Sequence, residues 1–135
     1  MAIQLVAQIG DAGPSLPFLI GPPGKAGSAP LNFIVDTGAS HTFIAISVLE
    51  KLCIKPLDEK NAPTQRPDGG VVKSQKYRIS LWTLDGIAIN EDFVARSARP
   101  YGCSGLIGQD ILSKCIMVHD GLQKIATLFF PDVKA

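Results

Sequence analysis

The sequence predicts an all-β fold, a small barrel that is closed or partly open and carries one or two short helices. Short segments in which apolar and polar residues alternate recur along the chain. Turn-forming residues separate these segments, since the 135 residues include 13 glycines and 10 prolines. One stretch, at 46–53, has clear helical spacing. We expect residues 1–135 to form a single domain, a length that can bury a sizeable core.

The expected strands follow from a period of two. In Ile3–Ile9, the residues Leu5, Ala7 and Ile9 fall on one side. Leu84–Ile87 supplies a hairpin turn between two of the strands, and 21–30 is expected to be a loop. The further expected strands are Leu16–Ile20, Leu31–Val35, Tyr77–Thr83, Ile87–Val94, Ile116–His119 and Lys124–Phe130.

Helical spacing relates Ile46, Leu49, Leu52 and Cys53, and Ser47 is a candidate cap for this helix. We expect its apolar side to join the core.

Composition argues against several classes of function. The formal net charge is +1 and the basic residues are scattered, so neither a nucleic acid nor an anionic membrane surface is an expected partner. No apolar run is long enough to span a bilayer, and Met1–Gln4 lacks the features of a secretory signal. Three widely spaced cysteines are an odd number, which argues against a disulfide framework and favours a cytoplasmic location.

Two motifs carry the chemistry. The run Asp36–Ser40 reads Asp-Thr-Gly-Ala-Ser and follows the apolar segment Leu31–Val35, so a carboxylate lies where a buried strand ends. A second apolar segment, Gly105–Leu112, runs into a glycine and a short helix. Together they resemble the retropepsin-like (retroviral-type) aspartic proteases, in the form of a small single-domain bacterial member. A plain turn that closes a strand is the alternative for Asp36-Thr37-Gly38.

The number of motifs sets the expected assembly. Hydrolysis of a peptide bond by carboxylates needs two of them, which share one proton and activate a water molecule. The chain contains one Asp-Thr-Gly, so the resemblance implies a two-fold homodimer in which Asp36 of each subunit meets its counterpart. The expected function is that of an aspartic endopeptidase.

The resemblance also assigns a role to each residue of the loop. Asp36 is the catalytic residue, and Thr37 braces the two loops through its hydroxyl. Gly38 allows close approach of the backbone. Ala39 leaves room for substrate, and Ser40 supports the Asp36 carboxylate.

The second motif would lie beneath this loop, with a helix over Gln109–Ser113. A flap, a glycine-tipped hairpin that closes over substrate, has its best match at Gln65–Gln75, although a surface turn at Asp68-Gly69-Gly70 is the alternative. Cys103 is either a site sensitive to oxidation or an inert buried thiol. The residues expected to contact substrate are Gly69, Gly70, Val71, Tyr101, Cys103, Leu106 and Ile107.

The expected substrate is an extended peptide with apolar side chains on both sides of the cut. No metal or organic cofactor is implied. The terminal strands, and Ile125–Phe130 in particular, are expected to help hold the dimer. Two other functions remain open: a catalytically silent dimer of this fold that binds peptides or partner proteins, and an unrelated small β-barrel interaction module.

Overall fold

The computed structural model describes residues 1–57, 62–65, 71–99 and 102–133. Among these residues, one sheet contains the strands in the order β10-β11-β1-β2-β3-β9-β4-β8-β7. The bounds of these strands are β1 Ile3–Gly10, β2 Gly13–Gly21, β3 Leu31–Val35, β4 Phe43–Ala45, β7 Lys76–Trp82, β8 Ala88–Ala98, β9 Gly105–Ile107, β10 Ile116–Asp120 and β11 Ile125–Phe130. An additional pairing of β2 with β7 closes β2, β3, β9, β4, β8 and β7 into a barrel. The predicted all-β barrel is therefore confirmed.

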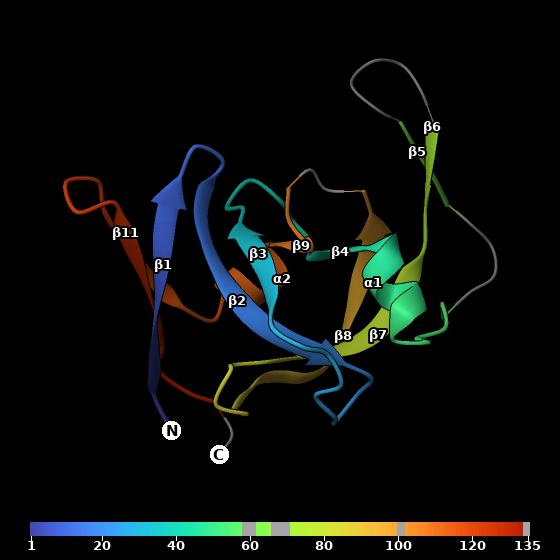
Figure 1. Cartoon of the computed structure of the whole chain (residues 1–135), viewed down its shortest axis with the longest axis horizontal. Helices are drawn as coiled ribbons and strands as arrows, with labels where there is room; N and C mark the ends of the chain where they lie inside the picture. The colour runs from blue at the N-terminus through green and yellow to red at the C-terminus, as the bar shows by residue number, and fades with distance from the viewer. Residues whose placement is uncertain (58–61, 66–70, 100–101, 134–135) are drawn as a thin grey trace.

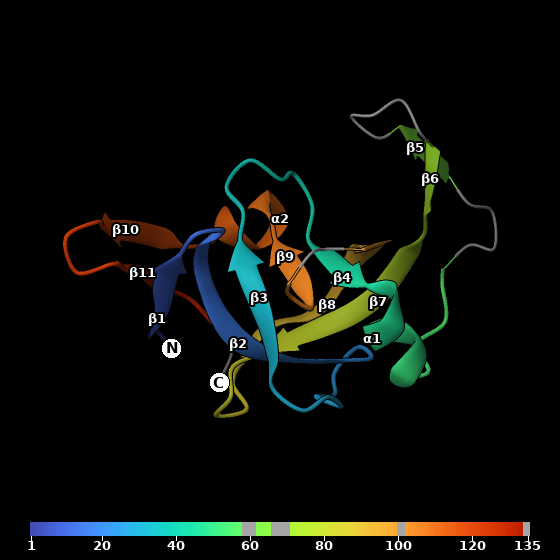
Figure 2. The ribbon, with the colours of Figure 1, turned by 45° about the horizontal axis from the view of Figure 1, so that its top comes forward.

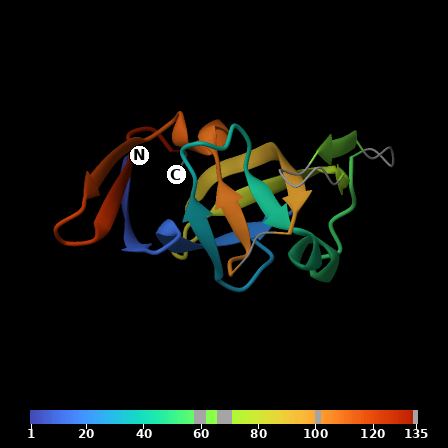
Figure 3. The same ribbon diagram turned by 90° about the horizontal axis from the view of Figure 1, so that it is seen from above.

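The order of strands in the barrel depends on two parallel pairings within a mainly antiparallel sheet. β3 pairs with β9 in parallel, and β4 pairs with β8 in parallel. β9 also pairs with β4 in the antiparallel sense, so β3, β9 and β4 lie side by side, as Figure 3 shows. The turn that follows β3 and the helix that follows β9 are thereby brought to the same end of the barrel (Figure 1).

Apolar side chains fill the barrel. Phe18 of β2 and Phe33 of β3 are buried, and their rings meet edge to face at a centroid distance of 5.9 Å. Phe33 also lies against the backbone of Gly105, where a Cβ atom would stand 2.5 Å from the ring. The close fit of these three residues holds β9 directly beside β3.

Two short helices are present among the described residues, α1 over Ile46–Lys51 and α2 over Gln109–Leu112. Both were expected, although each ends earlier than predicted. Leu49 points into the core from α1, as its spacing indicated. The expectation for Ser47 is wrong: the N-cap is Ala45, without a side-chain hydrogen bond, and Ser47 lies inside the helix.

The strand Tyr77–Thr83 is confirmed as β7, but its alternation is not complete. Ser80, expected on the polar face, is buried. Its hydroxyl lies 2.7 Å from the carbonyl oxygen of Pro22 and accepts a hydrogen bond from Trp82 Nε1 at 2.8 Å. An irregular register between Ile79 and Leu81 turns the serine inward, where the backbone of the loop after β2 satisfies its hydroxyl.

β1, β11 and β10 extend the sheet beyond the barrel, at the left of Figure 2. β11 pairs with β1 along one edge and with β10 along the other. The expectation that Ile125–Phe130 pairs with a partner subunit is therefore wrong, because both of its edges are occupied within the chain. The two ends of the chain are also joined, since Met1 and Val133 exchange two hydrogen bonds between their backbones.

A separate hairpin consists of β5, Ala62–Gln65, and β6, Val71–Ser74, with Gln65 opposite Val71. It stands away from the barrel, on the side opposite β10 and β11 (Figure 2). The hairpin lies where the flap was expected, but its predicted tip, Gly69-Gly70, lies outside the described residues. Within the described ranges, no helix has both the length and the apolarity needed to cross a membrane.

The three cysteines are free thiols. Cys53, just after α1, is exposed, whereas Cys115 packs partly against the core. Burial raises the pKa of the Cys115 thiol, because a thiolate is poorly solvated there.

We expect iodoacetamide to alkylate Cys53 before Cys115 in the folded protein at neutral pH. A raised pKa means that a smaller fraction of Cys115 is thiolate at a given pH, and partial burial hinders its access further. Mass spectrometry of peptides after timed quenching measures both rates. In urea the two thiols should react at similar rates, and similar rates in the folded protein would contradict the prediction.

Candidate active site

Asp36 lies at the carboxyl end of β3, directly after the buried Val35. The parallel register places Val35 beside Ile107, and the Asp36 N–H donates to the Ile107 carbonyl at 2.9 Å. The pairing with β9 thus continues through the backbone of Asp36 itself. Its side chain emerges half-buried at the end of the barrel, as the sequence predicted.

Residues 36–42, which we call the Asp36 loop, turn sharply after β3. The Asp36 carboxylate accepts a hydrogen bond from the Gly38 N–H at 3.0 Å. The backbone carbonyl of Asp36 accepts a second one from the Ala39 N–H at 3.1 Å. Thr37, Gly38 and Ser40 are exposed in the single chain. Backbone groups of the loop itself therefore orient the carboxylate, while the outer surface of the loop is accessible to solvent.

The structure describes the surroundings of Gly38 and Ser40, to which the sequence assigned roles in this loop. A Cβ at Gly38 would come no closer than 3.4 Å to Asp36 Oδ1, an ordinary contact within one chain. No contact among the described residues requires glycine at position 38, so its predicted role in the close approach of two subunits stays a prediction. Among the described residues, the hydrogen bond to the Asp36 carboxylate comes from Gly38, whereas the predicted support by Ser40 stays a prediction.

Residues 107–110, which we call the support segment, hold the Asp36 loop from below. The Gln109 N–H donates to the Ala39 carbonyl at 2.8 Å, and Gln109 Nε2 donates to the Thr37 carbonyl at 2.9 Å. Gly108 passes so close that an added Cβ would stand 2.3 Å from the His41 carbonyl oxygen. Because such a contact cannot exist without movement, only glycine permits this approach.

The far end of the loop is fixed by a side-chain network that sequence reasoning missed. Thr42 donates to the Asp110 carboxylate twice, from its N–H at 3.0 Å and from Oγ1 at 2.7 Å. Thr42 Oγ1 in turn accepts the Gly108 N–H at 3.2 Å. The only local signal was an acidic residue in the first turn of a helix, a position that many helices share.

The residues expected to contact substrate are only partly placed. Ile107 is buried beneath the loop and Leu106 beside it is half-buried, so both belong to the strand under the site. Cys103 is half-buried ahead of β9, and Val71 begins β6. Gly69, Gly70 and Tyr101 lie outside the described residues.

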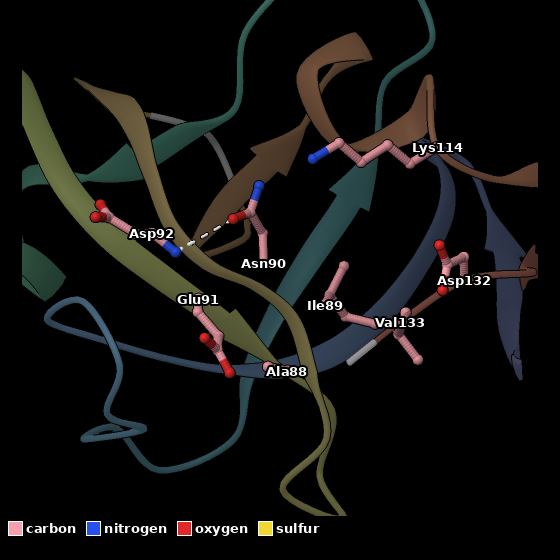
Figure 4. A pocket seen from close by; sticks show the side chains of 8 residues that line it. All are labelled: Ala88, Ile89, Asn90, Glu91, Asp92, Lys114, Asp132 and Val133. Carbon is pink, nitrogen blue, oxygen red and sulfur yellow. Dashed lines mark hydrogen bonds between the residues drawn. The ribbon is translucent and has the colours of Figure 1, made fainter. Parts of the chain in front are cut away.

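A pocket of about 400 Å³ lies elsewhere on the barrel. Its lining side chains come from β8 and from the segments that follow α2 and β11 (Figure 4). They combine one ammonium group, that of Lys114, with the carboxylates of Glu91, Asp92 and Asp132. Asp92 is already paired with Arg78 at 2.8 Å. The pocket contains none of the predicted catalytic or substrate-binding residues, so the Asp36 loop remains the candidate site.

Comparison with known families assigns the chain to one of them. Residues 23–111 match the model of a family described as aspartyl protease, a range that includes both the Asp36 loop and the support segment. The chain belongs to this aspartyl protease family. No curated protein matches the chain significantly.

Two solved structures show that this family member has a retropepsin-like fold. A retropepsin-like aspartic protease from Rickettsia conorii is similar with a TM-score of 0.69 and 15% identity, over 96% of this chain and 92% of that one. EIAV protease, in complex with the inhibitor HBY-793, is similar with a TM-score of 0.53 and 19% identity, over 74% of this chain and 85% of that one. At these identities the likeness concerns the fold. Together with the family match, it argues against an unrelated β-barrel.

Replacing Gly108 by Ala should destabilise the protein and displace the Asp36 loop. The new Cβ would meet the backbone of His41 and Ala39, and overpacking of this kind costs about 1–3 kcal/mol. Urea unfolding monitored by circular dichroism measures the change. Gly10→Ala is a matched control, because a Cβ at Gly10 meets nothing within 4 Å. Equal stability of the two variants would contradict the close approach.

Proposed function

We propose that this aspartyl protease family member is an endopeptidase that works as a homodimer, with one Asp36 from each subunit. The observation that carries the proposal is the arrangement of the Asp36 loop. A half-buried carboxylate is fixed at the end of a buried strand, and the residues around it are exposed in the single chain. The family match to residues 23–111 supports the same chemistry.

The chemistry explains why two copies are needed. Two carboxylates held about 3 Å apart do not both ionise readily, so the pair keeps one proton. The ionised carboxylate accepts a proton from water while the protonated one donates a hydrogen bond to the carbonyl of the peptide bond. The water oxygen then bonds to the carbonyl carbon. Transfer of a proton to the nitrogen allows the C–N bond to break, which leaves a carboxylic acid and an amine.

The loop is suited to this exchange because it supplies a fixed acceptor. The carboxylate is oriented by the Gly38 amide, and the backbone of Asp36 is held by Ile107. A preorganised group need not rearrange as charge develops in the transition state. Thr37 and Gly38, both exposed, are free to meet their counterparts across a two-fold axis.

β10 offers a surface on which the dimer can form. It is the outermost strand of the extended sheet, and residues 113–115 alone separate it from α2, the helix in which the support segment ends. Ile116 and Val118 of β10 are 59% and 60% exposed, and Val6 of β1 is 51% exposed. The register places Val118 and Val6 on either side of Thr127, so these side chains share the outer face.

An open strand edge beside an exposed apolar face is a recurrent feature of association surfaces. Pairing of β10 with β10 of a second copy would continue the sheet and cover this face. We propose this edge in place of Ile125–Phe130, whose edges are used within the chain.

The proposed substrate is an extended peptide, because the Asp36 loop follows directly on a strand of the sheet, and a strand can pair with an extended chain. The β5–β6 hairpin is the proposed flap. Backbone hydrogen bonds to such elements recognise an extended chain with little regard to sequence, and apolar side chains would fill the neighbouring pockets.

Replacing Asp36 by Asn should abolish cleavage while leaving the fold and the dimer intact. Asn cannot take a proton from water, so the pair loses its base, whereas its Oδ1 can still accept the Gly38 N–H. An unfolded protein substrate incubated between about pH 3 and 7, a range that brackets a shared-proton pair, reveals fragments by mass spectrometry.

Three outcomes can be told apart. Cleavage by the wild type alone establishes the aspartic endopeptidase. Equal cleavage by both proteins points to a contaminating protease and rejects the role of Asp36. A wild-type dimer that cleaves nothing over the whole pH range supports the alternative function, a silent dimer that binds peptides.

Replacing Val118 by Lys should raise the dissociation constant of the dimer at least about tenfold, because like charges brought together across an interface cost several kcal/mol. Sedimentation over a range of concentrations measures it, and specific activity should fall with dilution in parallel. Val94→Lys is the matched control, since Val94 is a strand valine that is 42% exposed on β8. An unchanged dimer in Val118→Lys would place the interface elsewhere.

A further inference from the structure

The Asp110 carboxylate is directed at the loop that carries Asp36. Oδ2 accepts the Thr42 N–H, and Oδ1 accepts the Thr42 hydroxyl at 2.7 Å together with the Ile111 N–H at 2.9 Å. The third of these bonds stays within the first turn of α2, but the first two reach a residue 68 positions away. Charge-assisted bonds of this kind are among the stronger hydrogen bonds in proteins.

Thr42 relays this interaction into the support segment. Its hydroxyl has one proton, which it donates to Asp110, and its oxygen accepts the Gly108 N–H. The side chain is fully buried, at 0% exposure, so no water competes for these bonds. One hydroxyl therefore connects the end of the Asp36 loop to both Gly108 and Asp110.

The loop is consequently held at its beginning, middle and end by one short segment. Ile107 fixes Asp36, Gln109 fixes Thr37 and Ala39, and the Thr42–Asp110 pair fixes the end. The Thr42 carbonyl also accepts the Arg96 N–H at 3.0 Å, which anchors that end to β8. A shift of Thr42 would pass directly into the loop, because Ser40 and His41 are exposed and add little packing.

We infer that Thr42 and Asp110 are positioning residues for catalysis: they set the place of Asp36 without touching substrate. The inference rests on the proposed function, since it concerns the geometry of a carboxylate pair. In the proposed dimer, an Asp36 loop that is free to shift in either subunit would move its carboxylate away from that of the other subunit. A displacement of about 1 Å can cost about 100-fold in rate. A purely structural role, the capping of α2, would affect stability and leave turnover unchanged.

The test compares Thr42→Val with Thr42→Ser and with Thr83→Val. Valine keeps the shape of threonine but removes the hydroxyl, whereas serine keeps the hydroxyl. Thr83 is a matched control, because it is also buried and its Oγ1 also accepts a backbone N–H, that of Ile87, in the turn between β7 and β8. Thr42→Val should lose more stability than Thr83→Val, because the Thr42 hydroxyl makes two hydrogen bonds, one of them to a carboxylate, so Thr83→Val controls for the loss of a buried hydroxyl away from the Asp36 loop.

We expect Thr42→Val to lower kcat about 10- to 100-fold with little change in KM, because the substrate contacts remain while the reacting carboxylates are misplaced. Thr42→Ser should recover a kcat close to that of the wild type, and Thr83→Val should keep it. Turnover of Thr42→Val that is no lower than that of Thr83→Val would overturn the inference while leaving the proposed function in place.

Asp110→Asn provides a second variant if Thr42→Val does not fold. An amide in place of the carboxylate keeps one acceptor for the Thr42 hydroxyl but presents an NH₂ group to the Thr42 N–H, so the same loss of kcat is expected.

A readout without substrate separates this inference from the proposed function. Hydrogen exchange of the Gln109 amide, which donates to Ala39, reports how firmly the loop is held. We expect faster exchange in Thr42→Val than in Thr83→Val or in the wild type. If the wild type cleaves nothing, the proposed function fails, and unchanged exchange in Thr42→Val would then overturn the positioning role as well.

Discussion

The parallel pairing of β3 with β9 is the constraint on which the rest of the structure depends. It joins two strands that are far apart in the chain, and it continues past the last residue of β3 into the backbone of Asp36. Because β9 leads directly into Gly108 and α2, the same pairing delivers the support segment beneath the Asp36 loop. The Asp36 carboxylate is thus carried on a turn, while its position is determined by the sheet, which is a stiffer element than a free loop.

The polar groups around this turn show why such a loop can be held tightly. A buried hydroxyl or N–H without a partner is costly, and around Thr42 each of these groups has one. Removing any member of the set leaves another without a partner, so the set acts as a unit. The close approach of Gly108 to His41 complements these bonds, since it brings the two backbones near enough for Gln109 to reach Ala39 and Thr37.

Local pattern predicted much of the fold and the place of Asp36 at the end of a buried strand. β3 has the predicted bounds, because an apolar run that ends in Asp-Thr-Gly is a local signal. β4 was missed because three residues are too few to show an alternation of apolar and polar side chains. The burial of Ser80 was missed because an irregular register interrupts the alternation along β7. The Thr42–Asp110 network was beyond prediction for a different reason: its partners are 68 positions apart, and neither residue type is unusual where it stands.

The neighbouring positions of β1 and β11 have a consequence for how the chain acquires its structure. β1 precedes the other described strands in the sequence and β11 follows them, yet the two strands pair from Ile3 to Gln8 of β1. Contacts of such wide sequence separation form late, because the chain between them must be ordered first. The extended sheet that presents β10 is therefore completed only after the barrel. The edge of β10 is therefore presented beside the outer face of β1 only after β11 has paired with β1.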